Sequence, residues 1–176
     1  MSKKKRNRPE RIVQTPHEKF MLEMYREIDK AITKELERLR IKGIVPTCKK
    51  GCHFCCRQVI NTNIPEAHVI GQYIKRNFTD YQRNDLRTRM SNWFKWVELE
   101  LPKHCSKQGD EMEAFYNYGP YCPLLVDGEC SIYSVRPVTC RTHYVSSSPD
   151  SCRSYTDAQS AQDEPTIPRI SGCQWQ

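Results

Sequence analysis

The clearest pattern in the chain is an amphipathic stretch that predicts a long helix over residues 16–41. Thr15 is a favourable N-cap, Pro16 suits the first helical position, and Glu18 completes a capping box with Thr15. Gly43 provides a stop signal just beyond the end. The opposite face is charged, so the helix is expected to cover a core on one side. The apolar stripe consists of Phe20, Met24, Ile28, Ile32, Leu36 and Leu39.

Three further helices are expected from the same periodicity. Residues 64–78 have Pro65 near their start, and residues 79–101 follow with Thr79 or Asp80 as the cap and Pro102 as the end. A short helix is also expected around residues 108–117. The apolar positions of the two longer segments are Val69, Ile70, Tyr73, Ile74, Phe78, Leu86, Met90, Trp93, Phe94, Val97 and Leu101.

From Tyr118 onward, short runs interrupted by Pro, Gly and Cys replace the helical pattern. The stretch VDGE is typical of a turn and predicts a small hairpin. We therefore expect a mainly α fold, a small helical domain with irregular cysteine-rich loops and one short hairpin. The predicted parts are a basic flexible arm, a helical cysteine-cluster domain and an extended tail, at residues 1–14, 15–155 and 156–176.

Most of the positive charge lies at the start of the sequence. The formal net charge is +7, and residues 1–11 hold six basic side chains against one acidic side chain, a net +5. Such an arm gains free energy from counterion release on a phosphate backbone, so nucleic acid is an expected partner. An acidic protein partner and a purely solubilising role are the alternatives. The basic residues are Lys3, Lys4, Lys5, Arg6, Arg8 and Arg11.

The interpretation of the cysteines depends on the cellular compartment of the protein. No apolar run is long enough for a membrane span, and no apolar segment follows the basic start as in a secretion signal. We therefore expect a cytoplasmic protein without membrane contact. Ten cysteines are many for a reducing compartment. Clustered thiols there more often bind metal or take part in redox chemistry than form disulfides.

Eight cysteines fall into two groups, which suits one centre formed where two segments meet. Cys52 and Cys55 are separated by two residues, which lets both sulfurs reach one metal while turn N–H groups stabilise the thiolates. The side chains of adjacent Cys55 and Cys56 diverge, which favours a polynuclear or paired centre. Alternatively, one of the two ligates and the other packs. The expected ligands are Cys48, Cys52, Cys55, Cys56, Cys122, Cys130, Cys140 and Cys152.

Zinc and iron–sulfur chemistry both fit this set. Zinc would occupy closed four-thiolate sites, and eight cysteines supply two of them. A [4Fe–4S] cluster takes four thiolates and leaves the rest for a second cluster or for structure. Adjacent and surplus thiols fit a cluster shell more easily, so iron–sulfur is slightly favoured over zinc. A structural metal staple is the first expectation for its role, ahead of electron transfer.

The runs CKKGCHFCC and CPLLVDGECSIYSVRPVTCR, with a later SC, resemble the YkgJ family of cysteine-cluster proteins. The resemblance covers about residues 48–155, and it implies a zinc- or iron-chelating domain. One departure from the family pattern is that three residues, not two, separate Cys48 from Cys52. Besides the eight cysteines, the matching positions are Ile132, Tyr133, Arg136, Pro137 and Arg141.

The resemblance leaves two classes of function open. The first is a metal-binding module, structural or redox, that docks on a protein or nucleic-acid partner. The second is a metal-dependent protein-modifying enzyme, because flagellin lysine methylases are similar in their cysteine motif. The sequence contains no glycine-rich strand–turn–helix that would seat S-adenosylmethionine. Tyr133 is expected to pack over the centre, and Arg136 and Arg141 to offset the negative charge of metal-bound thiolates.

Other residue types receive structural interpretations. His53 and His143 lie beside cysteines and are expected to be neighbours of the centre, with ligation as the alternative. A nucleophilic pair of Cys140 and His143 is a weaker alternative, since thiols that hold metal are not free nucleophiles. Trp93 and Phe94 are expected in the core, with Trp96 partly off that face; nucleobase stacking by these aromatics is the alternative.

Overall fold

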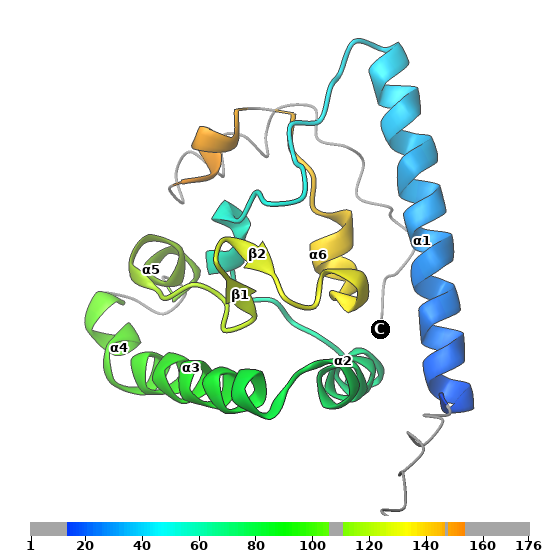
Figure 1. Ribbon diagram of the computed structural model, residues 1–176. Helices are drawn as coiled ribbons and strands as arrows, with labels where there is room; N and C mark the ends of the chain where they lie inside the picture. The colour runs from blue at the N-terminus through cyan, green and yellow to red at the C-terminus, as the bar shows by residue number, and fades with distance from the viewer. Residues whose placement is uncertain (1–13, 106–110, 147, 154–176) are drawn as a thin grey trace, which may run out of the picture.

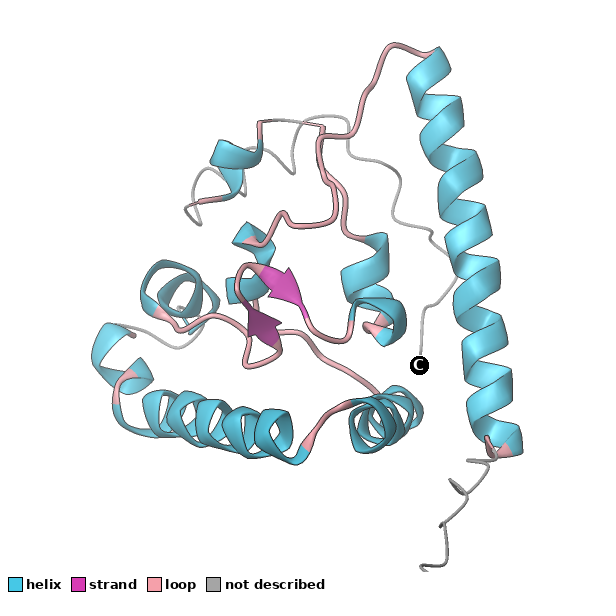
Figure 2. Ribbon diagram, viewed as in Figure 1, coloured by secondary structure: helices cyan, strands magenta, loops and turns pink. Residues whose placement is uncertain are grey.

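The computed structural model describes residues 14–105, 111–146 and 148–153 of the chain. Within them the fold is mainly helical with one two-stranded antiparallel hairpin, as predicted (Figure 1; Figure 2). No helix in these ranges has both the length and the apolar character needed to cross a membrane. In chain order the elements are α1 (Pro16–Ile41), η1 (Phe54–Arg57), α2 (Ile64–Asn77), α3 (Asp80–Leu99), α4 (Leu101–His104), α5 (Glu111–Tyr118), β1 (Leu125–Val126), β2 (Glu129–Cys130), η2 (Tyr133–Val135), α6 (Val138–Thr142) and η3 (Pro149–Cys152), where η marks 3₁₀ helices.

Parts of the two predicted terminal segments are not among these residues. The tail 156–176, including Cys173, and positions 1–13 of the arm, including all six of its basic residues, lie outside the described ranges.

The first helix begins as its sequence predicts. The Thr15 hydroxyl accepts from the N–H of Glu18 at 3.1 Å, and the Glu18 carboxylate accepts from the N–H of Thr15 at 3.0 Å. Glu18 is also buried and pairs with Arg76 of α2. The capping box therefore also helps to tie α1 to α2.

The predicted apolar stripe of α1 is wrong at Phe20, whose side chain is 67% exposed. The buried face carries Met21, Tyr25, Ile32 and Leu39 instead. Met21 and Tyr25 are four positions apart and meet the same neighbouring elements, whereas Phe20 lies one residue earlier and is turned away by about 100°. The buried face is rotated relative to the predicted one because the core neighbours Val69 and Ile132 lie on the side of Tyr25.

The next two helices also carry capping boxes, built from Asn63 with Glu66 and from Thr79 with Gln82. The predicted end of the third helix at Pro102 is wrong. α3 ends at Leu99, and Pro102 lies in the first turn of the short helix α4. Proline is compatible with a first turn because the N–H groups there need no partner within the helix.

The predicted hairpin forms around a two-residue turn. Leu125 pairs with Cys130, and Val126 pairs with Glu129. Asp127 and Gly128 have φ values of 50° and 78°. Positive φ at both central residues gives the turn whose twist matches paired strands, and Asp-Gly is a favourable sequence for it.

The main core lies where α1 crosses α2 and the segment after the hairpin. Met21 and Tyr25 of α1 pack with Val69 of α2 and with Ile132 and Val135. Figure 1 shows α1 along one side of the molecule, with α2 near its N-terminal end and the hairpin and α6 between α1 and α5. The core thus fixes the hairpin against the helices that surround it.

A second, aromatic cluster joins α3, α4 and α5. Trp93 and Trp96 both contact Phe115, with ring centroids 5.2 and 5.1 Å apart. Phe115 is buried, while Phe94 is 57% exposed. Core packing is therefore confirmed for Trp93 and wrong for Phe94, and Trp96 lies in the cluster because α5 covers that side of α3.

Candidate metal centre

The eight candidate cysteines come from four segments that lie close together, and their side chains are thiols that are half-buried or, at Cys152, buried. Cys48 and Cys52 lie in the loop after α1, with Cys55 and Cys56 in η1. The other four are Cys122 just before β1, Cys130 in β2, Cys140 in α6 and Cys152 in η3.

Cys48 is held by the segment that leads to η3. The N–H of Val145 donates to the Cys48 sulfur at 3.2 Å, and the N–H of Thr47 donates to the Val145 carbonyl at 3.0 Å. Cys152 follows shortly after, and its carbonyl accepts a hydrogen bond from the hydroxyl of buried Tyr116. These contacts bring the first cysteine of the chain next to the last of the eight.

Cys122 is held directly against η1. Its N–H donates to the carbonyl of Cys56 at 2.7 Å, and the N–H of Leu125 donates back to the Cys122 carbonyl at 2.9 Å. The hairpin that carries Cys130 begins at Leu125. One short hydrogen bond therefore fixes the position of two cysteines relative to Cys56.

Backbone N–H groups point at four of the sulfurs, including that of Cys55, which accepts from its own N–H. The N–H groups of Leu124 and Leu125 donate to Cys122, and the N–H of Ile132 donates to Cys130. Together with Val145 on Cys48, these donors stabilise negative charge on sulfur, as the turns around metal-bound thiolates do. This feature was predicted for the Cys52–Cys55 turn, and the structure provides it at Cys55 and at three other cysteines.

Cys55 and Cys56 affect each other's ionisation through a hydrogen bond between their side chains. The Cys56 thiol donates to the Cys55 sulfur, and this hydrogen bond is the main reason that the pKa of Cys55 is lowered to about 7. The same hydrogen bond, followed by burial, raises the pKa of Cys56. Cys55 is therefore more readily ionised than its neighbour Cys56.

Burial is the main cause of the raised pKa at five other cysteines. It brings Cys140 to about 12 and Cys152 to about 11. The thiolate charge of Cys55 is a further cause at both of these. The remaining cysteines with a pKa raised mainly by burial are Cys48, Cys122 and Cys130.

The donor set fits a thiophilic metal by its chemistry. Desolvated, mutually repelling thiolates are costly on their own, and a bound cation removes that cost. Among the described residues, no three Cys, His, Asp or Glu side chains already stand in the arrangement of a metal site. The thiols are gathered, and ligation itself remains a prediction.

Arg136 lies close enough to several thiols for its charge to act on them, and Tyr133 lies against its guanidinium. The Arg136 guanidinium stacks on the Tyr133 ring at 3.7 Å from its centroid and donates to the Tyr133 carbonyl at 3.2 Å. Its positive charge acts to lower the pKa of Cys55, Cys130 and Cys140. This position suits the predicted role of offsetting thiolate charge.

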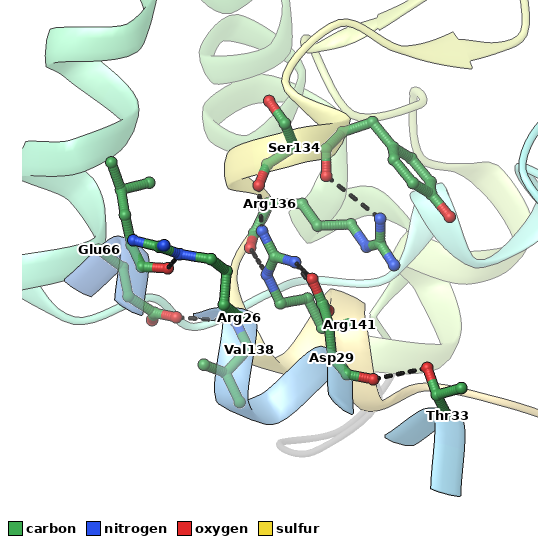
Figure 3. A network of polar contacts seen from close by, with 10 residues as sticks. Arg26, Asp29, Thr33, Glu66, Ser134, Arg136, Val138 and Arg141 are labelled. Carbon is green, nitrogen blue, oxygen red and sulfur yellow. Dashed lines mark hydrogen bonds and ion pairs between the residues drawn. The ribbon is translucent and has the colours of Figure 1, made fainter. Parts of the chain in front are cut away.

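Arg141 occupies a different place, which Figure 3 shows. Its buried guanidinium donates to Asp29 of α1 at 2.9 and 2.7 Å, to the Arg136 carbonyl at 3.0 Å and to the Ser134 carbonyl. It also lies 4.3 Å from the centroid of the Tyr25 ring. These contacts make Arg141 a joint between α1 and the segment that carries Arg136.

Two further guanidinium groups near the thiols were not predicted. Arg89 of α3 donates to the carbonyls of Pro123 and Leu125 at 2.5 and 3.1 Å, and its charge acts on Cys122. Arg57 lies 4.4 Å from the centroid of the Tyr121 ring. Arg57 directly follows Cys55 and Cys56, so the sequence alone could have indicated it. Arg89 lies in α3, far from any of the eight cysteines in sequence, so the sequence contained no such signal.

His53 directly precedes η1 and packs between two aromatic rings. Its ring contacts those of Phe54 and Tyr121 at centroid distances of 5.4 and 5.5 Å, and Nδ1 is 3.3 Å from the Gly51 carbonyl oxygen. Cys105 and Cys173 are not among the matching cysteines, and the latter lies outside the described residues.

Comparison of the chain with protein-family models, with curated proteins and with solved structures finds no match.

Proposed function

We propose that this protein is a metal-binding cysteine-cluster protein whose eight thiols hold iron–sulfur or zinc, with iron–sulfur slightly favoured. The observation that carries the proposal is the gathering of eight cysteines from four segments around η1. Metal binding in proteins needs deprotonated thiols, and the site provides N–H donors and guanidinium charges that favour them. The metal would staple the segments together or, as a cluster, carry electrons.

The proposal gives each part of the site a role. The eight cysteines would be ligands, Arg136 would balance their charge, and Arg57 and Arg89 would add positive charge nearby. Such a centre is suited to a reducing compartment, so the proposal places the protein in the cytoplasm.

The direct test is elemental analysis for iron, zinc and acid-labile sulfide on protein purified without oxygen, together with its absorption spectrum. We expect stoichiometric metal in the wild type and in Cys105→Ser, which changes a cysteine outside the eight. Cys55→Ser is expected to lower the metal content. Wild-type protein that contains neither iron nor zinc would contradict the proposal.

The basic arm adds a polyanionic partner to this proposal, with nucleic acid as the first candidate. Six cations in residues 1–11 would each displace counterions from a phosphate backbone. Replacing the six by Gln is expected to weaken binding to a single-stranded RNA oligonucleotide and to flatten its salt dependence. Equal binding by both proteins would leave an acidic protein as the partner to test.

A further inference from the structure

Three half-buried aromatic rings form a row beside the cysteine loop. The His53 ring contacts those of Phe54 and Tyr121, at centroid distances of 5.4 and 5.5 Å. Each outer ring has a guanidinium group over it. Arg57 lies 4.4 Å from the centroid of the Tyr121 ring. Arg153, which follows η3, lies 5.1 Å from the centroid of the Phe54 ring. The ring row (Phe54, His53 and Tyr121) therefore has a cation at either end.

A further ring, that of Tyr133, lies within reach of the same loop. It is 37% exposed, and Nζ of Lys50 lies 5.9 Å from its centroid. Nζ of Lys50 also lies 3.7 Å from the carboxylate of Glu129 in β2. The hairpin turn lies against the ring row, because a Cβ on Gly128 would be 3.7 Å from Nδ1 of His53. The cysteine loop and the hairpin thus present their rings and cations together.

Cations outnumber carboxylates among the described side chains of this surface. Five basic side chains stand against two acidic ones, a net +3. The ion pair of Lys50 with Glu129 is 62% exposed on both sides, so solvent screens it and either partner can exchange it for another. The basic side chains are Lys49, Lys50, Arg57, Arg136 and Arg153, and the acidic ones are Asp127 and Glu129.

Arg57 and Arg136 lie over rings and not against carboxylates. Neither forms an ion pair with a described residue, whereas Arg141 pairs with Asp29. The Nε of Arg57 is shielded from solvent and meets no acceptor among the described residues. A guanidinium group that rests on a ring keeps donors for an anion, and phosphate oxygens match its geometry.

This combination of rings and cations matches the two parts of an unpaired nucleotide. A free base has a flat apolar face that stacks on an aromatic ring or a guanidinium plane, and the phosphate pairs with Lys and Arg. In a duplex the bases are stacked on each other and cannot reach such rings. An acidic peptide would use the cations and leave the rings without a partner.

We propose that this surface binds single-stranded nucleic acid, with bases stacked on the ring row and phosphates held by the surrounding cations. The inference rests on the nucleic-acid partner of the proposed function. It gives that partner a contact on the folded domain, in addition to the basic arm.

Photocrosslinking tests the location on the wild-type chain, without any substitution that could unfold it. The probe is a single-stranded oligouridylate that contains 5-iodouridine, whose excited base couples to an aromatic side chain stacked on it. Peptide mapping by mass spectrometry is expected to find crosslinks at the ring row or at Tyr133. Crosslinks confined to the arm, or to Tyr81 and Phe94 of α3, would overturn the inference, as would a failure to crosslink the ring row.

Substitution of one ring separates stacking from charge. Fluorescence anisotropy with a labelled oligouridylate would measure the affinity. Tyr121→Leu removes the ring and is expected to weaken binding about tenfold. Tyr121→Phe keeps the ring, and Tyr81→Leu removes an 80% exposed ring elsewhere, so both should bind as the wild type does. Equal affinities of Tyr121→Leu and Tyr121→Phe would overturn the inference.

Competition distinguishes nucleic acid from an acidic protein and separates this surface from the arm. Poly-L-glutamate that binds as tightly as the oligouridylate would overturn the inference in favour of an acidic protein. Binding that depends on the six basic residues of the arm and not on Tyr121 would overturn the surface and leave the arm as the contact. No binding of oligouridylate by the wild type would overturn both, whereas the metal content tests the metal centre alone.

Discussion

At the scale of single residues, Arg141 shows how a buried charge can organise a small domain. It is 2% exposed, and its guanidinium meets one carboxylate and two backbone carbonyls. Arginine suits this place because its planar group donates in several fixed directions at once, which lysine does not. Asp29 lies 112 positions earlier in the chain, so the contact closes a long loop.

We predict that Arg141→Lys lowers the free energy of unfolding by about 2 kcal/mol, because several hydrogen bonds to a charged group are lost. Urea unfolding of the metal-free protein would measure this. Arg40→Lys is the matched control, since Arg40 is exposed on α1 and its pair with Glu37 is 3.8 Å long. Equal effects of the two substitutions would contradict the role given to Arg141.

Residues with local partners were predictable, and those with distant partners were not. The Thr15 cap depends on Glu18, three positions away, so the sequence alone indicates it. The cysteine motif includes Arg141, so the sequence singles this residue out. Its partner Asp29 lies in α1, outside the motif, and could not be identified in the same way. The interpretation of Arg141 as a balance for thiolate charge therefore missed its observed carboxylate partner.

At the scale of elements, two glycines differ in the space available for a side chain. Gly71, inside α2, has open space where a Cβ would lie. At Gly119, just after α5, a Cβ would lie 2.3 Å from the Phe115 carbonyl oxygen and 2.8 Å from the ring atom Cδ1. An alanine thus fits the first position and collides with backbone at the second.

We predict that Gly71→Ala raises the free energy of unfolding by about 0.5–1 kcal/mol, through reduced backbone entropy of the unfolded chain. Gly119→Ala is expected to lower it by about 1–3 kcal/mol, because the end of α5 must shift. Thermal unfolding of both variants gives the comparison. A Gly119→Ala variant as stable as the wild type would show that this end of α5 is not fixed.

The start of α2 is joined to α6 through one buried carboxylate. Glu66 accepts from the N–H of Val138 at 2.7 Å through Oε1 (Figure 3). Through Oε2 it accepts from the Thr62 hydroxyl and from the N–H of Asn63. Both oxygens are therefore in use. A glutamine retains only one acceptor oxygen at this position.

We predict that Glu66→Gln lowers the free energy of unfolding by about 1–2 kcal/mol, since one buried donor is left without its acceptor. Glu98→Gln changes an exposed residue of α3 in the same way and should have little effect. Chemical unfolding of the two variants side by side is the measurement. No difference between them would mean that Glu66 does not join α2 to α6.

The helices themselves were largely predictable, because apolar periodicity and capping residues are local properties of the sequence. Their orientation was less so. The sequence does not say which neighbour a helix meets. For this reason the buried face of α1 was predicted to include Phe20, which is exposed. Pro102 marks a helix boundary both in the sequence prediction and in the structure, but in the structure it lies in the first turn of α4.

At the scale of the whole molecule, the thiols make stability depend on pH. In the metal-free protein the pKa of Cys140 is about 12 and that of Cys152 about 11, mainly through burial. Unfolded thiols ionise near pH 8.5, about three pH units below the folded value at Cys140. The folded state therefore keeps protons that the unfolded state releases above that pH.

We predict that the metal-free protein loses stability as pH rises from about 8.5 toward 12, and that this contribution is complete below about 8.5. Cys55, with a pKa lowered to about 7, acts in the opposite direction between its folded and unfolded values. Urea midpoints measured across this range in strong reductant would show the trend. Cys140→Ala should reduce the slope, and an unchanged slope would contradict the assignment to burial.

Metal should reverse this dependence, because bound metal needs thiolates and protons compete with it. We predict that the metal-loaded protein loses stability as pH falls below 7. Thermal unfolding of the loaded protein at pH 7 and pH 5 measures the effect, with metal-free protein as the control. Equal changes of the unfolding temperature in the two forms would contradict the prediction, because the pH dependence would then not come from metal binding.

The spacing of the cysteines and the surrounding motif are visible in the sequence, which is why the eight could be proposed as one set of ligands. The sequence did not indicate which backbone contacts position them, such as those of Cys122 with Cys56 and of Val145 with Cys48. Arg89 likewise approaches Cys122 from α3, and its own sequence surroundings give no reason to expect it.

The central claim is that the gathered thiols are metal ligands. X-ray absorption at the iron and zinc edges, on protein purified without oxygen, tests it most directly. The account predicts a first coordination shell of sulfur alone, with four thiolates around each zinc at about 2.3 Å, or sulfide and thiolate around each iron. Metal bound through oxygen or nitrogen, or no metal at either edge, would contradict it.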